Sequence, residues 1–382
     1  GNDQSGLGRF VYLDNVTLSG GGPIGSLLYL VNEHSVANPR IGAEKIKKQN
    51  YGIELGLFDN INLSVDLFKE RINNMVVSAS SNIPEYQGVP LNQYPVTNTG
   101  SAENSGYEVT LGYSKKINSD WSLNFNGFFS DAKNKIIDTH EGLRSEDYIY
   151  RKRQEGFPLG QQFGYLIDKS NGNGYFNSKE ELEKNNLMYS MGTPRVGDLV
   201  YQDLNNDGVI DEKDKAPIGH GSIPRHYYGF SGTINYKSFD LSFMFQGVGK
   251  WGSIYSGKGV YETSHSGVFS SLHKKAWTKD RYENGEEIKY PALSTIKSVN
   301  HESSEFYYYD RSYLRLKNIE FGYTLPLKWA KAIAANKIRF TLSGQNLITW
   351  AKMKNNDFGP EASSYDSIPV YKTYNIGLSI QF

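Results

Sequence analysis

The chain has 382 residues, a length that allows one large domain or two to three ordinary ones. Its 41 Lys and Arg residues are balanced by 41 Asp and Glu residues, so no overall positive charge favours binding to nucleic acid. It contains no Cys, which excludes disulfides, thiolate metal sites and Cys nucleophiles. No apolar run approaches the roughly 18 residues that a membrane-spanning helix requires.

Aromatic residues and glycine are unusually frequent. Tyr, Phe and Trp (28, 19 and 5 residues) make up 14% of the chain, alongside 39 Gly. This combination is typical of β-structure with aromatic strand ends and glycine bends. The proteins with this composition include the membrane β-barrels, which hydropathy windows designed for helices do not detect.

Segments in which apolar and polar residues alternate predict the strands, because successive side chains of a strand point to opposite faces. In chain order, the clear segments are 107–114, 121–130, 228–236, 239–246, 338–343 and 373–382. Weaker segments are 10–17, 51–58, 62–76, 148–154, 163–169 and 313–323. The pattern therefore predicts about twelve strands.

The two faces of the last predicted strand show what each face would contact. Ile376 and Leu378 lie on the apolar face and would contact lipid, whereas Asn375 and Ser379 lie on the polar face and would contact a wet pore. In most of these strands the polar residues are small and uncharged, as in the interior of a barrel. The last predicted strand, 373–382, has about ten residues, which is the length of a tilted strand that crosses a bilayer.

The connectors between these segments alternate between short and long. The short ones are 59–61, 115–120, 155–161, 237–238 and 324–335, and the long ones are 77–104, 131–147, 170–225, 248–311 and 347–372. A soluble antiparallel sandwich also has alternating strands, but nothing sorts its loops by length. Outer-membrane barrels have short periplasmic turns and long external loops, so the pattern favours an all-β transmembrane antiparallel β-barrel over a sandwich.

Aromatic residues beside the short turns support the same sidedness. We expect an aromatic girdle at the inner membrane interface, although strand ends also collect Tyr for other reasons. Its members would be Tyr113, Trp121, Tyr236, Phe239, Tyr323 and Phe382.

Two short helices interrupt the β-pattern. Ser178 with Glu181 forms a capping box that predicts a helix through about Asn185, inside a long loop. Pro326 near a first helical turn predicts a second helix over 326–334, on the side of the short turns.

One segment has the residue pattern of an EF-hand calcium loop, which supplies oxygen ligands at fixed offsets around one cation. The predicted ligands are Asp203, Asn205, Asp207, the carbonyl of Val209, and Asp214. Position 12 of the pattern is Asp rather than Glu, which lowers the expected affinity, and no helix enters the loop. The prediction is a structural Ca²⁺ that orders a long loop; the alternative is an Asx-rich turn held by its own hydrogen bonds without an ion.

No set of catalytic residues emerges, so the chain is not expected to be an enzyme. The seven His residues have neither metal-ligand spacing nor a nucleophile elbow. The aromatic run 306–309 has two interpretations: a stacking platform for sugar rings, or packing at the barrel rim beside the strand that starts at Tyr313.

A series of different short motifs is spread along nearly the whole chain. They include Asn50-Tyr51-Gly52-Ile53-Glu54, Asn104-Ser105-Gly106-Tyr107-Glu108, Gly156-Phe157-Pro158-Leu159-Gly160, Gly197-Asp198, Phe239-Asp240-Leu241-Ser242, Ser312-Tyr313-Leu314-Arg315-Leu316-Lys317-Asn318 and Ser343-Gly344-Gln345-Asn346-Leu347. In order and spacing, the chain resembles the C-terminal part of SusC/RagA-type TonB-linked outer-membrane transporters. The alternating strand that ends at Phe382 also looks like a signal for barrel assembly.

The resemblance implies the C-terminal portion of a 22-stranded TonB-dependent transporter barrel in the cell outer membrane. It implies import of oligosaccharides or peptides together with a SusD-like surface lipoprotein, with energy delivered through TonB. Residues 1–382 would form one barrel segment with long extracellular loops at 170–225 and 248–311. The plug and the TonB box would lie outside this chain.

The leading hypothesis is therefore nutrient transport, with outer-membrane lipid, TonB and a SusD-like lipoprotein as partners and no role for nucleic acid. The pattern assigns no substrate-contacting residue. The competing hypothesis is a soluble all-β carbohydrate-binding module with a calcium-ordered loop.

Overall fold

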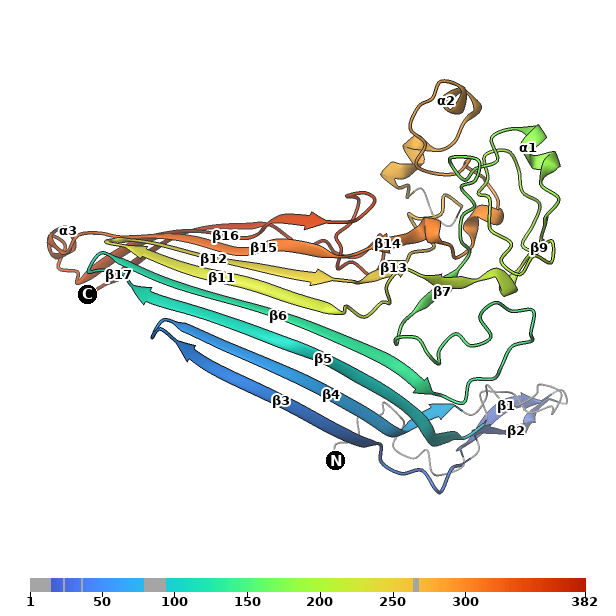
Figure 1. Cartoon of the computed structure of the whole chain (residues 1–382), viewed down its shortest axis with the longest axis horizontal. Helices are drawn as coiled ribbons and strands as arrows, with labels where there is room; N and C mark the ends of the chain where they lie inside the picture. The colour runs from blue at the N-terminus through green and yellow to red at the C-terminus, as the bar shows by residue number, and fades with distance from the viewer. Residues whose placement is uncertain (1–14, 23–24, 36, 79–93, 264–267) are drawn as a thin grey trace.

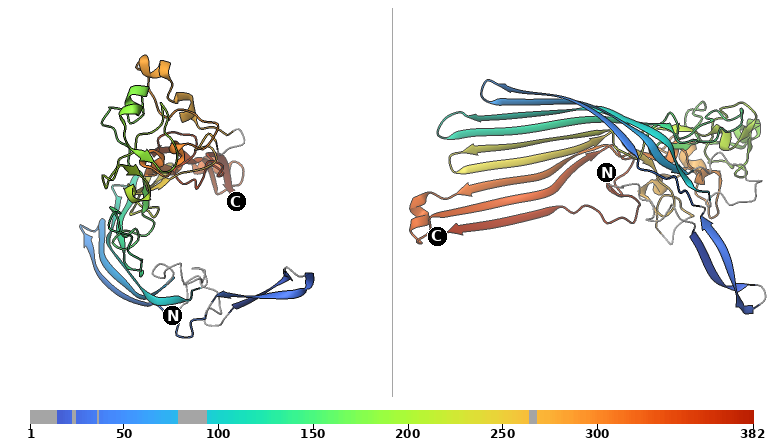
Figure 2. Two further views of the ribbon diagram at one scale, coloured as in Figure 1. Left: turned by 90° about the vertical axis from the view of Figure 1, so that its right-hand side faces the viewer. Right: turned by 90° about the horizontal axis from the view of Figure 1, so that it is seen from below.

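The computed structural model describes residues 15–22, 25–35, 37–78, 94–263 and 268–382. Nine long strands form one antiparallel sheet in the order β3-β4-β5-β6-β11-β12-β15-β16-β17. They are β3 (Lys45–Leu57), β4 (Ile61–Ser78), β5 (Val96–Lys116), β6 (Trp121–Asp138), β11 (His226–Tyr236), β12 (Phe239–Gly249), β15 (Tyr313–Thr324), β16 (Lys337–Ala351) and β17 (Thr373–Gln381). Each of these strands pairs with its neighbours along the chain, so the sheet is a meander that curves into a wall (Figures 1 and 2).

Short turns join the strands at one end of the sheet (Figure 1). Lys237 adopts a left-handed backbone (φ 51°) in the two-residue turn between β11 and β12. The side chain of Asn118 accepts hydrogen bonds from the N–H groups of Asp120 and Trp121, which closes the turn before β6. The helix α3 (Leu327–Lys331) follows Pro326 between β15 and β16, as predicted.

The long connectors gather at the other end of the sheet and form a packed body, here called the loop body (Figure 1). It contains short elements: β7 (Gln162–Gly164), α1 (Lys179–Lys184), β8 (Met188–Tyr189), β9 (Val209–Ile210), β10 (Ala216–Ile218), β13 (Gly252–Ile254), α2 (Lys279–Glu283) and β14 (Tyr308–Asp310). The predicted helix start is confirmed, since the Ser178 side chain accepts the Glu181 N–H at the start of α1. The predicted capping box forms only by half, because the Glu181 carboxylate accepts the N–H of Asn177 (2.9 Å). The predicted alternation of short and long connectors is confirmed for the strands of the sheet.

A separate hairpin of β1 (Asn15–Gly22) and β2 (Gly25–Ser35) extends away from the sheet (Figure 2). Part of the predicted strand 10–17 lies outside the described residues. Among the described residues no helix is long and apolar enough to cross a membrane.

The sheet contains nine of the about twelve predicted strands, because three predicted segments are not in it. The described part of segment 10–17 belongs to β1 of the separate hairpin. Residues 148–154 form no strand: the Glu141 carboxylate accepts the N–H groups of Arg153, Gln154 and Glu155, which a strand would give to a neighbour. Segment 163–169 contributes the end of β7, which pairs with β10, and isolated bridges at Tyr165 and Ile167. The connector from β6 to β11 is therefore one long loop, 139–225, and 155–161 is not a barrel turn.

The largest fully buried side chains of the described residues lie in the loop body, not between layers of sheet. One core contains Phe176, Leu199 and Tyr201, and a second contains Tyr290 and Tyr307. The sheet has no second sheet packed against it, and the described strands outside it form only two-stranded pairs. Because no second sheet covers the apolar face of this sheet, that face requires a non-aqueous environment such as the lipid of a membrane.

Candidate functional site

One face of the sheet is continuously apolar. The strand register places Ile53, Val65, Val109, Phe129 and Tyr228 in one row across five strands. Large apolar side chains remain exposed on this face, with Leu342 at 57% and Ile376 at 87%. A contiguous exposed apolar surface of this extent is expected where lipid covers it.

The opposite face is mostly polar. One row contains Asn62, Gly112, Asn126 and Ser231. Near the turn end, Arg339 forms ion pairs with Asp240 (2.6 Å) and Glu320 (2.8 Å). Charges paired in this way suit a water-filled interior, so the sheet separates lipid from a wet lumen.

Aromatic rings mark the turn end of the apolar face, as predicted. The ring centroids of Trp121 and Tyr236 are 4.3 Å apart, and those of Phe239 and Tyr323 are 4.5 Å apart. These pairs lie beside the short turns, where a girdle at the membrane interface is expected.

A buried amide joins the two longest connectors into the loop body. The Asn300 side chain accepts the Leu199 N–H (2.8 Å) and donates to the Asp198 carboxylate (2.7 Å). Asp198 also accepts the Arg195 N–H (2.8 Å). Asn300 and Asp198 are completely buried, so these bonds hold residues about a hundred positions apart in one packed unit.

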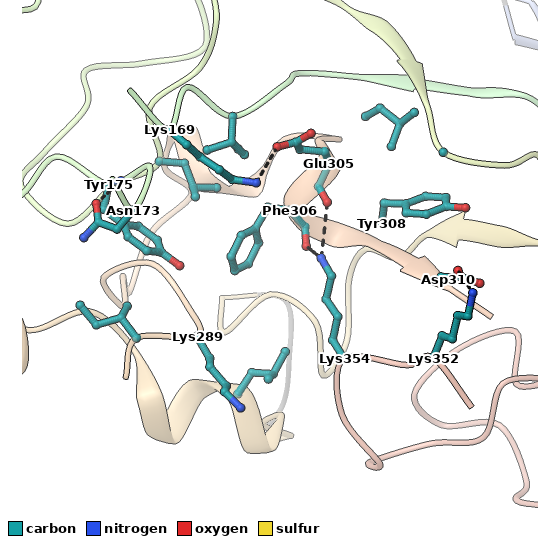
Figure 3. Close-up of a pocket in the computed structure, with 16 residues that line it drawn as sticks. Lys169, Asn173, Tyr175, Lys289, Glu305, Phe306, Tyr308, Asp310, Lys352 and Lys354 are labelled. Carbon is teal, nitrogen blue, oxygen red and sulfur yellow. Dashed lines mark hydrogen bonds and ion pairs between the residues drawn. The ribbon is translucent and has the colours of Figure 1, made fainter. Parts of the chain in front are cut away.

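The loop body contains a cavity of about 680 Å³ whose walls come from segments far apart in sequence (Figure 3). This cavity, the loop pocket, has aromatic walls from Tyr175, Phe306 and Tyr308. Its charged lining residues are Lys169, Lys289, Lys352, Lys354, Glu305 and Asp310. A cavity of this size is within the usual range of ligand-binding pockets.

Alternate residues of the aromatic run 306–309 point in opposite directions. Phe306 and Tyr308 line the loop pocket, whereas Tyr307 and Tyr309 are buried in the second core. Packing therefore accounts for Tyr307 and Tyr309, whereas stacking of sugar rings on Phe306 and Tyr308 stays a prediction. Nothing in the sequence pattern indicated the lysines, because folding alone brings their separate segments together.

The predicted calcium loop shares local backbone features with an EF-hand loop. Gly208 has a positive φ of 84° and its N–H donates to Asp203 (2.9 Å). β9, formed by Val209 and Ile210, pairs with β8, and Asp211 caps the following turn of 3₁₀-helix (Glu212–Asp214). The sharp turn at Gly208 is therefore present as the motif predicts, and Ca²⁺ binding stays a prediction.

The side chains of this loop use their oxygens in other ways. The buried Asp214 accepts the N–H groups of Leu204 and Asp211, both at 2.9 Å. The ammonium group of Lys213 lies 3.3 Å from Asp207 and 2.7 Å from Asp147. Among the described residues, no three His, Cys, Asp or Glu side chains are placed together to hold a metal ion. As arranged here, the loop closes on hydrogen bonds and on the Lys213 charge.

Two carboxylates, the buried Glu141 and the partly buried Glu155, hold the segment 139–155 together. Besides the three N–H groups already described, Glu141 accepts a bond from the Arg144 guanidinium (3.0 Å). Glu155 accepts the N–H groups of Thr139 (3.1 Å) and Glu141 (3.0 Å) and pairs with Lys152. Burial opposes ionisation of Glu155, but Lys152 and the N–H groups outweigh it and lower the pKa of Glu155 to about 2.

This pKa predicts how segment 139–155 responds to acid. A carboxyl with a lowered folded-state pKa stabilises the fold above its unfolded pKa, near 4.5, and that contribution disappears as the pH falls toward 2. We expect pepsin to cleave within 139–155 increasingly between about pH 4.5 and pH 2. Glu155→Gln should be cleaved readily across the whole range, and a wild-type cleavage rate independent of pH in this window would contradict the assignment.

Known proteins match the chain over most of its length. The family model "TonB dependent receptor-like, beta-barrel" matches residues 15–347. TonB-dependent receptor P3 of Formosa agariphila is 28% identical over 91% of this chain and 35% of its own length. TonB-dependent receptor SusC of Bacteroides thetaiotaomicron is 24% identical over 94% of this chain and 34% of its own length. The chain thus spans about a third of the curated relatives that it matches.

Solved structures share the fold. The RagAB peptide importer in the open-open state superposes with a TM-score of 0.72 at 20% identity, covering 99% of this chain and 39% of that one. The alternative of a soluble sandwich is wrong, because the long strands form a single membrane wall and not two packed sheets. The family consists of receptors and transporters, so the chain is not an enzyme. The chain belongs to the TonB-dependent receptor β-barrel family and forms part of an outer-membrane β-barrel.

Proposed function

We propose that this chain forms the C-terminal wall and outer loops of a TonB-dependent importer of oligosaccharides or peptides, acting with a SusD-like surface lipoprotein. The observation that carries the proposal is the asymmetry of the wall: it separates an apolar face from a polar face and carries a folded loop body at one end only. A passive membrane anchor would not need a loop body with a cavity. The likeness to the RagAB peptide importer supports the peptide class, and the likeness to SusC supports a receptor of the SusC type. The oligosaccharide class and the lipoprotein partner follow from the family resemblance of the sequence motifs.

The two edges of the sheet support a larger barrel. β3 is exposed along its whole length and β17 along nearly all of it. Unpaired strand edges are not tolerated in lipid, because their N–H and C=O groups would lack partners. We propose that strands from the rest of the complete protein pair with both edges and close a 22-stranded barrel around a plug that contacts TonB.

Uptake in cells tests this function. Bacteria carrying the complete protein should accumulate a fluorescently labelled oligosaccharide or peptide only when both TonB and the lipoprotein encoded beside the transporter are present. Deleting TonB should abolish uptake without removing the protein from the outer membrane. Uptake that persists without TonB, or extraction of the protein without detergent, would refute the proposal.

We also propose that the acidic loop takes up Ca²⁺ in competition with Lys213. The backbone shares local features with an EF-hand loop, and a cation would use Asp203, Asn205, Asp207, Val209 and Asp214. Because Lys213 neutralises Asp207 and Asp147, it would have to move aside for the ion.

A matched pair of variants tests the calcium proposal. Lys213→Gln should strengthen Ca²⁺ binding by roughly tenfold, since it removes a competing charge in direct contact with a ligand. Asp207→Asn should weaken binding, and titration calorimetry on the chelator-treated protein would measure both. If wild type and Lys213→Gln both show no heat of binding at millimolar Ca²⁺, the loop is an Asx-rich turn without an ion.

A further inference from the structure

The loop pocket carries more positive than negative charge, although the whole chain is neutral. Four lysines line it and only two carboxylates do, Glu305 and Asp310. The lysines come from three separate segments of the chain, and Figure 3 shows their side chains around one space. A cavity with excess positive charge attracts an anionic ligand.

Three of the four lysines already have a carboxylate partner. Lys169 lies 3.2 Å from Glu305, Lys289 lies 3.0 Å from Glu287, and Lys352 lies 3.9 Å from Asp310. These pairs neutralise most of the charge at the edges of the loop pocket.

Lys354 differs from the other three. Its ammonium group donates to the main-chain carbonyls of Phe306 and Glu305, and no carboxylate of the described residues lies within ion-pair distance of it. It also lies 5.3 Å from the ring centroids of both Phe306 and Tyr309. Carbonyls and rings orient this cation without neutralising it, so its charge is available to a ligand.

The protein around Lys354 makes its charge costly. Desolvation lowers the pKa of Lys354 to about 8. Lys354 is exposed, so an anion can reach its ammonium group and offset the hydration that the neighbouring protein removes. The rings of Phe306 and Tyr308 beside it provide flat surfaces for an apolar or sugar-ring face of the same ligand.

We propose that the loop pocket binds a carboxylate group of an acidic oligomer, with the Lys354 ammonium as its direct partner. The inference rests on the proposed import function and narrows its substrate class. A uronic-acid oligosaccharide and an acidic peptide both present this group, and the test distinguishes the two sources.

The test compares three probes on the complete protein purified in detergent. The probes are a uronic-acid pentasaccharide, a pentaglutamate peptide and a neutral pentasaccharide, each titrated by calorimetry. We expect at least one acidic probe to bind more tightly than the neutral one, and the effect should weaken with salt. The acidic probe that binds identifies the source.

Lys354→Gln should weaken the acidic probe by about tenfold or more, because it removes one charge-assisted hydrogen bond, and should leave any weak binding of the neutral probe unchanged. Lys279→Gln is the matched control, since Lys279 lies on α2 in the same loop body, is exposed and does not line the loop pocket. It should bind all probes as the wild type does.

Proton uptake gives a second, independent measurement. An anion beside Lys354 raises its pKa above 8, so binding at pH 8 should take up a fraction of a proton, whereas binding at pH 6 should not. The binding enthalpy at pH 8 should therefore depend on the ionisation enthalpy of the buffer, and this dependence should vanish in Lys354→Gln.

Three results would overturn the inference: equal binding of acidic and neutral probes, no binding of either acidic probe at millimolar concentration, or unchanged acidic binding in Lys354→Gln. None of these binding results would contradict TonB-dependent uptake measured in cells. Failure of the substrate class is thus separable from failure of the transport function.

Discussion

Leu342→Arg is expected to lower the free energy of unfolding of the membrane-embedded barrel by about 2–4 kcal/mol, the cost of Arg on the lipid face near the bilayer midplane. Leu342 lies on the apolar face of β16, between Phe321 of β15 and Ile376 of β17. Ile376 is close to the centre of the last strand, which places this row near mid-membrane. The Leu342 side chain is 57% exposed, so the variant disturbs little protein packing and mainly reports the lipid contact.

Ser343→Arg is the matched control at nearly the same depth. Ser343 points to the polar face, where the register places it beside Glu320 and Asn375. An Arg there remains in water next to a carboxylate, so we expect a change within about 0.5 kcal/mol. Urea unfolding in lipid vesicles would measure both variants, and equal destabilisation would contradict the sidedness of the wall.

Spin labels on β17 check the same sidedness directly. Labels at Ile376 and Leu378 should be accessible to oxygen dissolved in lipid, and labels at Asn375 and Ser379 to a water-soluble nickel complex. The reversed accessibility would show that the apolar face contacts the aqueous lumen and would contradict the proposed sidedness.

Asn300→Ala is expected to destabilise the loop body by about 2–4 kcal/mol, roughly a 30- to 700-fold rise in its open population. The substitution leaves the Leu199 N–H without its partner and removes one donor from the Asp198 carboxylate, both in a completely buried position. Unsatisfied buried groups cost more than the net value of the bonds themselves. The connectors that contain residues 199 and 300 should then separate more often.

Hydrogen exchange of residues 176–201 and 290–307 would measure this opening in the purified protein. Asn186→Ala is the control, because Asn186 is exposed on the same loop body and should change stability by less than about 0.5 kcal/mol. Unchanged exchange in Asn300→Ala would mean that the two connectors are not coupled through this amide.

The regular part of the fold could be predicted from local pattern. β17 alternates strictly and β12 largely does, because one face meets lipid and the other meets water. The short turns between strands have clear turn residues such as Asn118. The helix at Ser178 and the backbone of the acidic loop also follow from local spacing.

Other strand boundaries could not be predicted in this way. β5 begins at Val96 and not near Tyr107, and β6 continues to Asp138, because the ladder extends beyond the lipid-facing region, where both faces can be polar and alternation is lost. Residues 148–154 alternate like a strand, but the Glu141 carboxylate binds their N–H groups first. Competition between a side chain and a strand for the same donors is a tertiary effect.

The sequence by itself determined the membrane wall, its sidedness and the end from which the long loops extend, because these depend on residues that are neighbours along the chain. Only the tertiary structure decided the loop pocket. Lys169 and Phe306 are more than a hundred residues apart in the sequence, and Phe306 and Lys354 are nearly fifty apart. No periodicity links these positions. Their proximity depends on the packing of two buried cores. The same packing decides which lysines form ion pairs, and therefore which positive charge remains for a ligand.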